Sequence, residues 1–112
     1  MYKYRANLVR IIDGDTIEAD IDLGFRVKIR QKIRLFGINT AELRSKNEAN
    51  RQLAKAAKRR LEELLRPLNG EFNLLSHGIG KFGRCLGEIF VNEECINDIL
   101  LSEGLADKYE ED

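Results

Sequence analysis

The first third of the chain shows a pattern of apolar and polar positions that predicts β-strands. Residues Leu8 to Ile12 form an apolar run. From Thr16 to Leu23 apolar and polar residues alternate strictly, which is typical of a strand with one buried face. Leu23 and Gly24 mark a tight turn, and the alternation continues from Phe25 to Leu35 with one interruption at Gln31. We therefore expect a long hairpin with one apolar and one charged face.

The charged face of this hairpin is acidic on its first arm and basic on its second. The basic residues of the second arm are Arg26, Lys28, Arg30, Lys32 and Arg34. Opposite charges on paired strands contribute about 0.2–1 kcal/mol per pair, which accounts for most of the basic row. Arg34 fits this explanation less well, because it lies at the end of the row nearest the loop from Asn39 to Glu42.

A helix is expected after the hairpin. Ser45 and Glu48 fit a capping box, in which each side chain would bind a backbone amide of the first turn. Apolar residues then recur at helical spacing, and Pro67 and Gly70 end the segment. The residues expected on the apolar face are Leu53, Ala57, Leu61, Leu64 and Leu65.

The remaining pattern predicts two strands, from Glu71 to Ser76 and from Cys85 to Val91, and a short helix from about Ile96 to Gly104. The polar tail from Tyr109 to Asp112 is expected to fray. Three strands, a helix, two strands and a helix predict a β-rich α+β fold. More specifically, we expect a five-stranded OB-fold barrel with one helix between strands 3 and 4 and a short C-terminal helix. Residues 1–112 are expected to form a single domain.

Composition limits the kinds of partner. Hydrophobic residues make up 43% of the chain and charged residues 34%, and no apolar segment reaches membrane-spanning length, so we expect no membrane partner. The 19 basic and 19 acidic residues balance, so any contact with nucleic acid must be local. We expect a monomer. The lack of an apolar leader after Met1 favours a cytoplasmic location, unless a leader has been removed from a secreted protein.

The two cysteines and the single histidine do not suggest a reactive centre. Cys85 and Cys95 have no zinc-like spacing and are interpreted as buried, reduced thiols. His77 lies between a strand-like run and a glycine-rich segment, without a nucleophilic partner nearby, and is interpreted as a surface or loop residue.

Candidate chemistry lies in three polar clusters at strand ends. Asp15 follows a glycine and offers a carboxylate to a hard cation, with Asp13 in a supporting position, although an Asp-Gly-Asp triplet by itself is more typical of a turn. Asn39 and Thr40 offer further oxygen ligands. Glu42 is placed to orient or deprotonate a water molecule. These oxygen atoms suit a metal ion, and the arginines Arg34 and Arg84 suit a phosphate. Together the two sets of groups predict a metal-assisted phosphodiesterase.

Arginines complete this set. Arg34 extends along its strand toward the same pocket, where the simpler alternative is a surface ion pair with Glu42 worth about 0–1 kcal/mol. Arg84 follows Gly83 and is placed to stabilise a phosphate transition state. Lys81 suits a phosphate contact and Phe82 a base-stacking platform, although basic residues are also common in ordinary glycine-rich turns.

The order and spacing of these clusters resemble the staphylococcal-nuclease-like (thermonuclease) family from about Tyr4 to Ala106. The matching motifs are Asp-Gly-Asp-Thr at 13–16, Arg-Leu-Phe-Gly-Ile-Asn-Thr-Ala-Glu at 34–42, Lys-Phe-Gly-Arg at 81–84 and Gly-Leu-Ala at 104–106. The resemblance implies an OB-fold, Ca²⁺-dependent endonuclease that acts on single-stranded or unpaired DNA and RNA and leaves 3′-phosphates.

The resemblance also implies a role for each matching residue. Asp15, Asn39 and the Thr40 carbonyl would hold calcium, and Glu42 would act on the attacking water. The scissile phosphate would be bound by Arg34 and Arg84, with Lys81 and Phe82 near the terminal phosphate and the base.

The chain departs from the family pattern at three positions within these motifs. Asn39 replaces a calcium-binding Asp, so we expect roughly ten- to a hundredfold weaker calcium binding. Ala41 replaces a common Pro, and Phe82 replaces a Tyr.

Two other functions compete with the nuclease. One is a catalytically weak or inactive nuclease-like module that binds nucleic acid or a protein partner. The other is a structural barrel unrelated to nucleic acid, for which the convergence of polar residues would be a coincidence.

Overall fold

The computed structural model describes residues 2–110. A 3₁₀ turn at Pro67–Gly70 follows the long helix α1. The strands and helices are β1 (Tyr2–Asp13), β2 (Thr16–Asp22), β3 (Lys28–Leu35), β4 (Ile38–Asn39), α1 (Glu48–Leu65), β5 (Glu71–Ile79), β6 (Cys85–Val91), β7 (Glu94–Cys95), α2 (Ile96–Ser102) and β8 (Asp107–Lys108).

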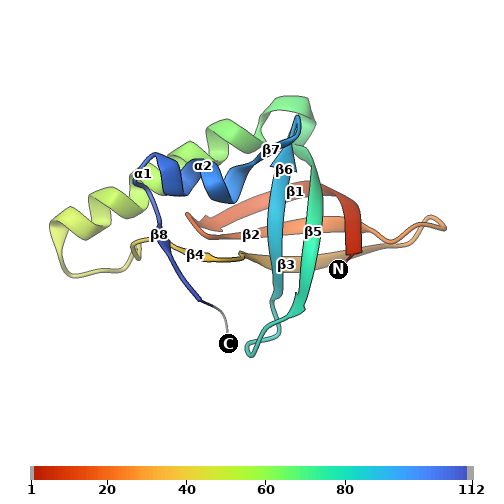
Figure 1. Ribbon diagram of the computed structural model, residues 1–112, viewed down its shortest axis with the longest axis horizontal. Helices are drawn as coiled ribbons and strands as arrows, with labels where there is room; N and C mark the ends of the chain where they lie inside the picture. The colour runs from red at the N-terminus through yellow and green to blue at the C-terminus, as the bar shows by residue number, and fades with distance from the viewer. Residues whose placement is uncertain (1, 111–112) are drawn as a thin grey trace.

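Five strands close into a barrel in the order β1-β2-β3-β6-β5 (Figure 1). β1 pairs antiparallel with both β2 and β5, and the barrel closes where β3 pairs in parallel with β6. The closing register joins Ile33 with Cys85, Arg34 with Leu86 and Leu35 with Gly87. This confirms the predicted OB-fold barrel, its single helix between the third and fourth barrel strands and its short C-terminal helix. The two-residue β4 is an additional element after β3.

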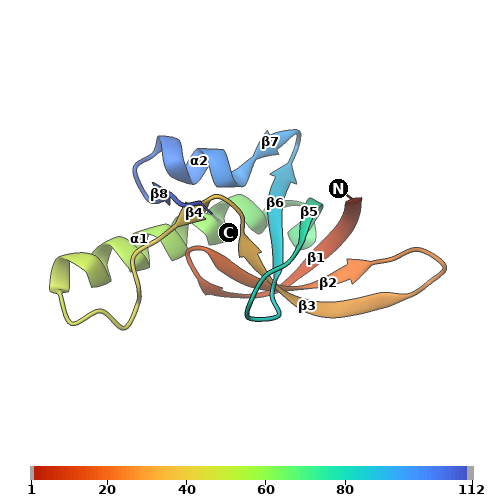
Figure 2. The same ribbon diagram turned by 60° about the horizontal axis from the view of Figure 1, so that its bottom comes forward.

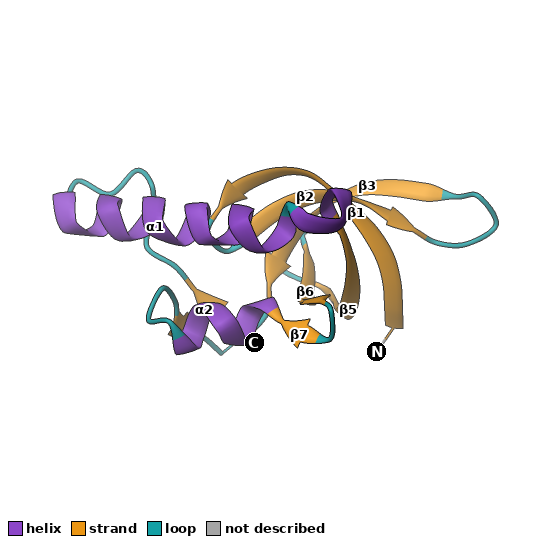
Figure 3. Cartoon of the chain, turned by 90° about the horizontal axis from the view of Figure 1, so that it is seen from above, coloured by secondary structure: helices purple, strands orange, loops and turns teal. Residues whose placement is uncertain are grey.

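The core fills the barrel and the space under α1, which lies beside α2 (Figure 3). The helix buries its small and branched residues, and Leu53, expected on the apolar face, is 48% exposed. The helix residues that are buried are Ala54, Ala57, Leu61 and Leu65.

The predicted capping box at the start of α1 is wrong. Asn47 is the N-cap, and its Oδ1 accepts from the Asn50 amide at 3.2 Å. Ser45 lies two residues before the N-cap, and its Oγ instead accepts from the Asn47 amide at 3.2 Å. Glu48 is therefore the first helical residue, and its carboxylate binds Arg51 within the helix. Ser45 and Asn47 can both cap the N-terminus of α1, and Asn47, which is nearer the helix, does so.

The hairpin of β2 and β3 extends beyond the barrel (Figure 2). β3 pairs with β6 only through its last three residues, so the rest of β3 has no second layer to pack against. The expected apolar face is consequently buried at Ile33 but 41% exposed at Ile29 and fully exposed at Phe25. The expected charge pairing across the strands is confirmed at Asp20 and Arg30, which form two hydrogen bonds of 2.9 and 3.2 Å.

Tyr109, the first residue of the tail expected to fray, is held in place by the segment around β4. β8 pairs antiparallel with β4, and the Tyr109 amide donates to the Gly37 carbonyl at 2.9 Å. The last two residues of the predicted frayed tail, Glu111 and Asp112, lie outside the described residues. Between residues 2 and 110, no helix is long and apolar enough to cross a membrane.

His77 is not a loop residue. It lies within β5, and its ring stacks on Phe36 with 3.9 Å between ring centroids and 3° between planes. Cys85 is buried, as interpreted from the sequence, whereas Cys95 is only half-buried; both thiols are free. Burial raises the pKa of both thiols.

Candidate functional site

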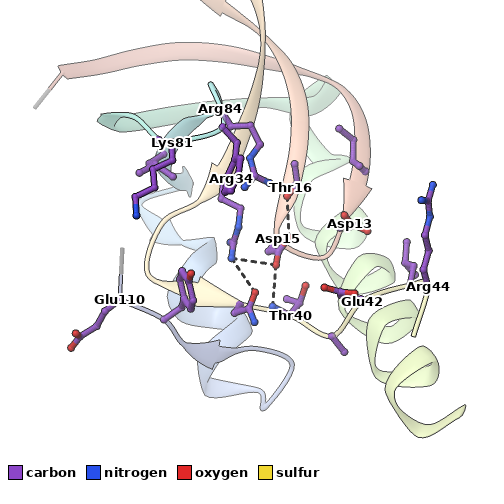
Figure 4. Close-up of a pocket in the computed structure, with 18 residues that line it drawn as sticks. Asp13, Asp15, Thr16, Arg34, Thr40, Glu42, Arg44, Lys81, Arg84 and Glu110 are labelled. Atoms are coloured by element: carbon purple, nitrogen blue, oxygen red, sulfur yellow. Dashed lines mark hydrogen bonds and ion pairs between the residues drawn. The ribbon is translucent and has the colours of Figure 1, made fainter. Parts of the chain in front are cut away.

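A cleft of about 730 Å³ lies where β2, β3 and β6 approach the segment of β4 and β8. All nine residues singled out in the sequence line it, so the fold brings three distant segments together (Figure 4). They are Asp13, Asp15, Arg34, Asn39, Thr40, Glu42, Lys81, Phe82 and Arg84.

Asp15 lies in the turn immediately before β2 and is fixed on both carboxylate oxygens. Oδ1 accepts from the Thr16 hydroxyl at 3.0 Å, and Oδ2 accepts from the Thr40 amide at 3.1 Å. The Asp15 carbonyl also accepts from the Leu35 amide at 2.8 Å. These bonds join the first polar cluster to the second, and they bury the carboxylate next to the cleft.

Gly14 allows this close approach between the β1–β2 turn and α1. A side-chain carbon at Gly14 would lie 2.7 Å from Cβ of Ala57 and 3.1 Å from Oγ1 of Thr40. Such distances are below van der Waals contact, so only glycine fits without movement. The glycine therefore sets the distance between the helix and the Thr40 segment.

Arg34 is a buried hub on the other side of Asp15, with a side chain that is 8% exposed. Its Nη1 donates to the carbonyls of Leu35 and Ile38 at 3.0 and 2.8 Å. Its Nη2 donates to Asn39 Oδ1 at 3.1 Å and lies 3.6 Å from Asp15 Oδ2. The surface ion pair between Arg34 and Glu42, the simpler alternative in the sequence analysis, is not formed. Arg34 instead organises the chain that links β3 to β4.

Three acidic side chains occupy one side of the cleft. The pKa of Asp13 is raised, first by partial burial and then by repulsion from Asp15 and Glu42, while Lys58 and Arg44 partly offset this. Repulsion of this kind shows that the carboxylates share one region of negative potential. Figure 4 shows Asp13, Asp15 and Glu42 around the same opening.

The donors on this side suit a hard divalent cation, which oxygen ligands bind best. The hydroxyl of Thr40 is buried without a hydrogen-bond partner, and a nearby cation would give its oxygen one. A cation would also reduce the repulsion between Asp13 and the neighbouring carboxylates. Within residues 2–110, no three acidic, histidine or cysteine side chains converge closely enough to hold a metal alone. The Asn39 amide, the Thr40 carbonyl and water would therefore have to complete its coordination.

The loop between β5 and β6 carries the third cluster. It is closed by hydrogen bonds from the Gly80 amide to the Arg84 carbonyl at 2.8 Å and from the Gly83 amide to the Gly80 carbonyl at 3.1 Å. Gly83 has φ of 77°, a conformation that favours glycine. Phe82 is 83% exposed, and the Arg84 guanidinium lies 5.7 Å from the centre of its ring. The loop thus presents an aromatic face and two cations to the cleft.

Among the other residues that line the cleft, three with charged or aromatic side chains were not singled out by sequence reasoning, namely Arg44, Tyr109 and Glu110. Arg34 lies 5.6 Å from the centre of the Tyr109 ring, within the range of a cation–π contact. The only signal for Tyr109 in the sequence is an aromatic residue in a polar tail, shortly after the predicted C-terminal helix.

Comparison with known proteins identifies one family. The family model described as staphylococcal nuclease homologue matches residues 32–112. A search of curated proteins found no match.

Proposed function

Because this chain belongs to the staphylococcal nuclease homologue family, we propose that it is a calcium-dependent endonuclease. It would hydrolyse phosphodiester bonds of single-stranded or unpaired DNA and RNA and leave 3′-phosphates. The observation that carries the proposal is the convergence of two arginines and three carboxylates in one cleft. This is the set of groups that hydrolysis of a phosphate diester requires: cations for the phosphate and a base for the water.

Asp15, Asn39 and the Thr40 carbonyl would hold the calcium ion. A bound calcium would neutralise charge on the phosphate and polarise it toward attack. Asp13 would act from behind Asp15 by adding negative potential to the same side of the cleft.

Glu42 is the candidate base. It is exposed to the cleft, and within the described chain its carboxylate makes no hydrogen bond or ion pair that would hold it away from a water molecule. It would accept a proton from the water as the water oxygen bonds to phosphorus. The bond from phosphorus to the 5′ oxygen then breaks, the 5′ oxygen takes a proton from solvent, and the phosphate stays on the 3′ side.

The two arginines would have different roles. Arg34 is held by two carbonyls and by Asn39, so it offers a fixed positive charge beside the phosphate. Within residues 2–110 Arg84 makes no ion pair and contacts Phe82, which leaves its guanidinium available to the charge that develops in the transition state. Lys81 and Phe82 would contact the terminal phosphate and base.

The proposal is tested by cleavage of an end-labelled single-stranded DNA oligonucleotide in millimolar Ca²⁺. We expect cleavage that is lost in a chelator and falls by at least a hundredfold in Glu42→Gln. Glu94→Gln, an exposed acidic residue on β7, is the matched control and should cleave as the parent does.

Absence of cleavage by the parent chain, with oligonucleotide binding retained, would overturn the nuclease. That result would support the alternative of an inactive nuclease-like binding module. Cleavage that persists in the chelator would remove calcium from the proposal.

A further inference from the structure

We propose that the outward face of β3 continues the cleft as a binding track for single-stranded nucleic acid. In this track Lys28 and Lys32 hold phosphates of nucleotides that extend from the cleft toward the tip of the hairpin. The inference rests on the proposed function for the identity of the ligand, but not on the chain being catalytically active.

The register of the barrel connects this track to the cleft. The parallel ladder of β3 and β6 begins with Ile33 opposite Cys85 and continues with Arg34 opposite Leu86. Side chains alternate between the two faces of a strand. One step before the ladder, Lys32 therefore lies beside Arg84, on the same outward face as Arg34.

The row then runs away from the cleft. Lys32 and Lys28 follow Arg34 on the outward face of β3, in register with Glu18 and Asp22 of β2. Two residues of a strand span about 7 Å, so Lys32 lies about that far from Arg34 along the strand and Lys28 about 13 Å farther. This reach corresponds to a few nucleotides of an extended single strand.

The charges of the hairpin leave these two lysines available. Each facing acidic residue is already engaged: Glu18 binds Arg10 at 3.0 Å, Asp20 binds Arg30, and Asp22 accepts from the Gly24 amide at 2.8 Å. Lys28 and Lys32 are exposed and form no ion pair within residues 2–110. The ion pairs neutralise Glu18 and Asp20, whereas Asp22 opposite Lys28 keeps its charge. Lys28 and Lys32 together still leave a net positive charge on this face of the hairpin.

The track and the cleft are connected by hydrogen bonds into one surface. The Gln31 side chain donates to the Gly83 carbonyl at 3.0 Å, which attaches the loop of Lys81 to Arg84 onto β3. The hairpin turn is closed by hydrogen bonds between Leu23 and Val27, and between Val27 and Gly24. Binding a strand along this surface would therefore order few protein groups, which favours affinity.

The free edge of β3 raises the alternative of pairing with a second copy of the chain. In an antiparallel pair around a two-fold axis, centred on Arg30, Lys28 would face Lys32 of the other copy. Like charges directly opposite one another destabilise a sheet. A polyanionic strand fits the same row, because each lysine then meets a phosphate.

The test measures the binding of fluorescent oligothymidylates of 3 and 12 nucleotides by fluorescence anisotropy at several salt concentrations. A chelator is present throughout, so that calcium-dependent cleavage does not occur. For the 12-mer, Lys28→Gln/Lys32→Gln should reduce affinity roughly tenfold and reduce the slope of log affinity against log salt by about 1.4, since each single-strand phosphate contact contributes about 0.7. The trinucleotide, which is too short to extend from Arg34 to Lys28, is the reference ligand.

Arg59→Gln/Arg66→Gln removes two positive charges from exposed positions within and just after α1, and is the matched control. An equal loss of affinity in this control, or an unchanged slope in the lysine variant, would overturn the track. Amine acetylation of the unmodified chain gives a second measure. The 12-mer should protect Lys28 and the trinucleotide should not; equal labelling of Lys28 in both complexes would also overturn the proposal.

These results are separate from the test of nuclease activity. A chain that binds the 12-mer through the lysines but cleaves nothing refutes the enzyme and keeps the track. A chain that cleaves but shows no dependence on the lysines keeps the enzyme and refutes the track.

Discussion

Arg34 donates to the side-chain oxygen of Asn39 over 3.1 Å, so the amide expected to face a cation is already held by an arginine. The same Nη2 atom lies 3.6 Å from Asp15 Oδ2. Arg34 therefore competes for two of the oxygens that a calcium ion would use. A phosphate bound to Arg34 would compete with these two oxygens for the guanidinium group. Substrate binding would therefore free the oxygens of Asn39 and Asp15 for a calcium ion.

Asn39→Asp should tighten calcium binding by roughly ten- to a hundredfold, because it adds one negative charge to the ligands. Isothermal titration with calcium measures this directly. Asn7→Asp, which adds the same charge at an exposed position on β1, is the control and should leave the affinity unchanged. Equal affinities in Asn39→Asp and the parent would remove Asn39 from the ligands.

Arg84→Ala should lower kcat by about a hundredfold or more while changing KM little, because this guanidinium is proposed to act mainly on the transition state. Steady-state cleavage of a single-stranded oligonucleotide separates the two constants. If KM rises by the same factor as kcat falls, Arg84 is a residue for binding the substrate in its ground state.

Gly14→Ala should destabilise the fold by about 1–3 kcal/mol, because the new methyl group would overlap Cβ of Ala57. Urea unfolding measures the change. The double variant Gly14→Ala/Ala57→Gly removes the overlapping carbon and should recover part of the loss, beyond the sum of the two single effects. Additive effects in this cycle would show that the two positions do not contact each other.

Asp13→Asn should stabilise the fold near pH 7 when no divalent cation is present. The folded-state pKa of Asp13 is raised by burial and by Asp15, so its charged form is disfavoured in the folded chain. The destabilisation is complete above the raised pKa and vanishes below the ordinary value of 3.8, where the group is protonated in both states.

Urea unfolding of Asp13→Asn in a chelator at pH 7 and pH 3 tests this. The gain in stability should be present at pH 7 and absent at pH 3. A variant that is less stable than the parent at pH 7 would show that the Asp13 carboxylate makes favourable contacts that outweigh its burial.

The elements of the barrel were predictable because their signals are local. Strict alternation from Thr16 onward depends only on which side chains point to each face, and the ends of β6 coincide with the predicted ones. The residue at which α1 begins was not predictable, because Ser45 and Asn47 have similar capping ability. Only the path of the loop decides which of them caps the helix. The alternation of apolar and polar residues assigned the apolar face of the hairpin correctly. It does not show how much of that face the rest of the barrel covers.

The sequence by itself determined the existence of the five barrel strands and the two helices, and the identity of the polar clusters, since periodicity and motif order are properties of short segments. It did not predict the short strands β4, β7 and β8 or the first half of β1. The tertiary structure decided which groups those clusters engage. It directed Arg34 to two carbonyls and Asn39, and it brought Tyr109 to the cleft through pairing of β8 with β4. These contacts join residues far apart in the chain or depend on a turn between strands, and their energies arise only once the barrel has closed.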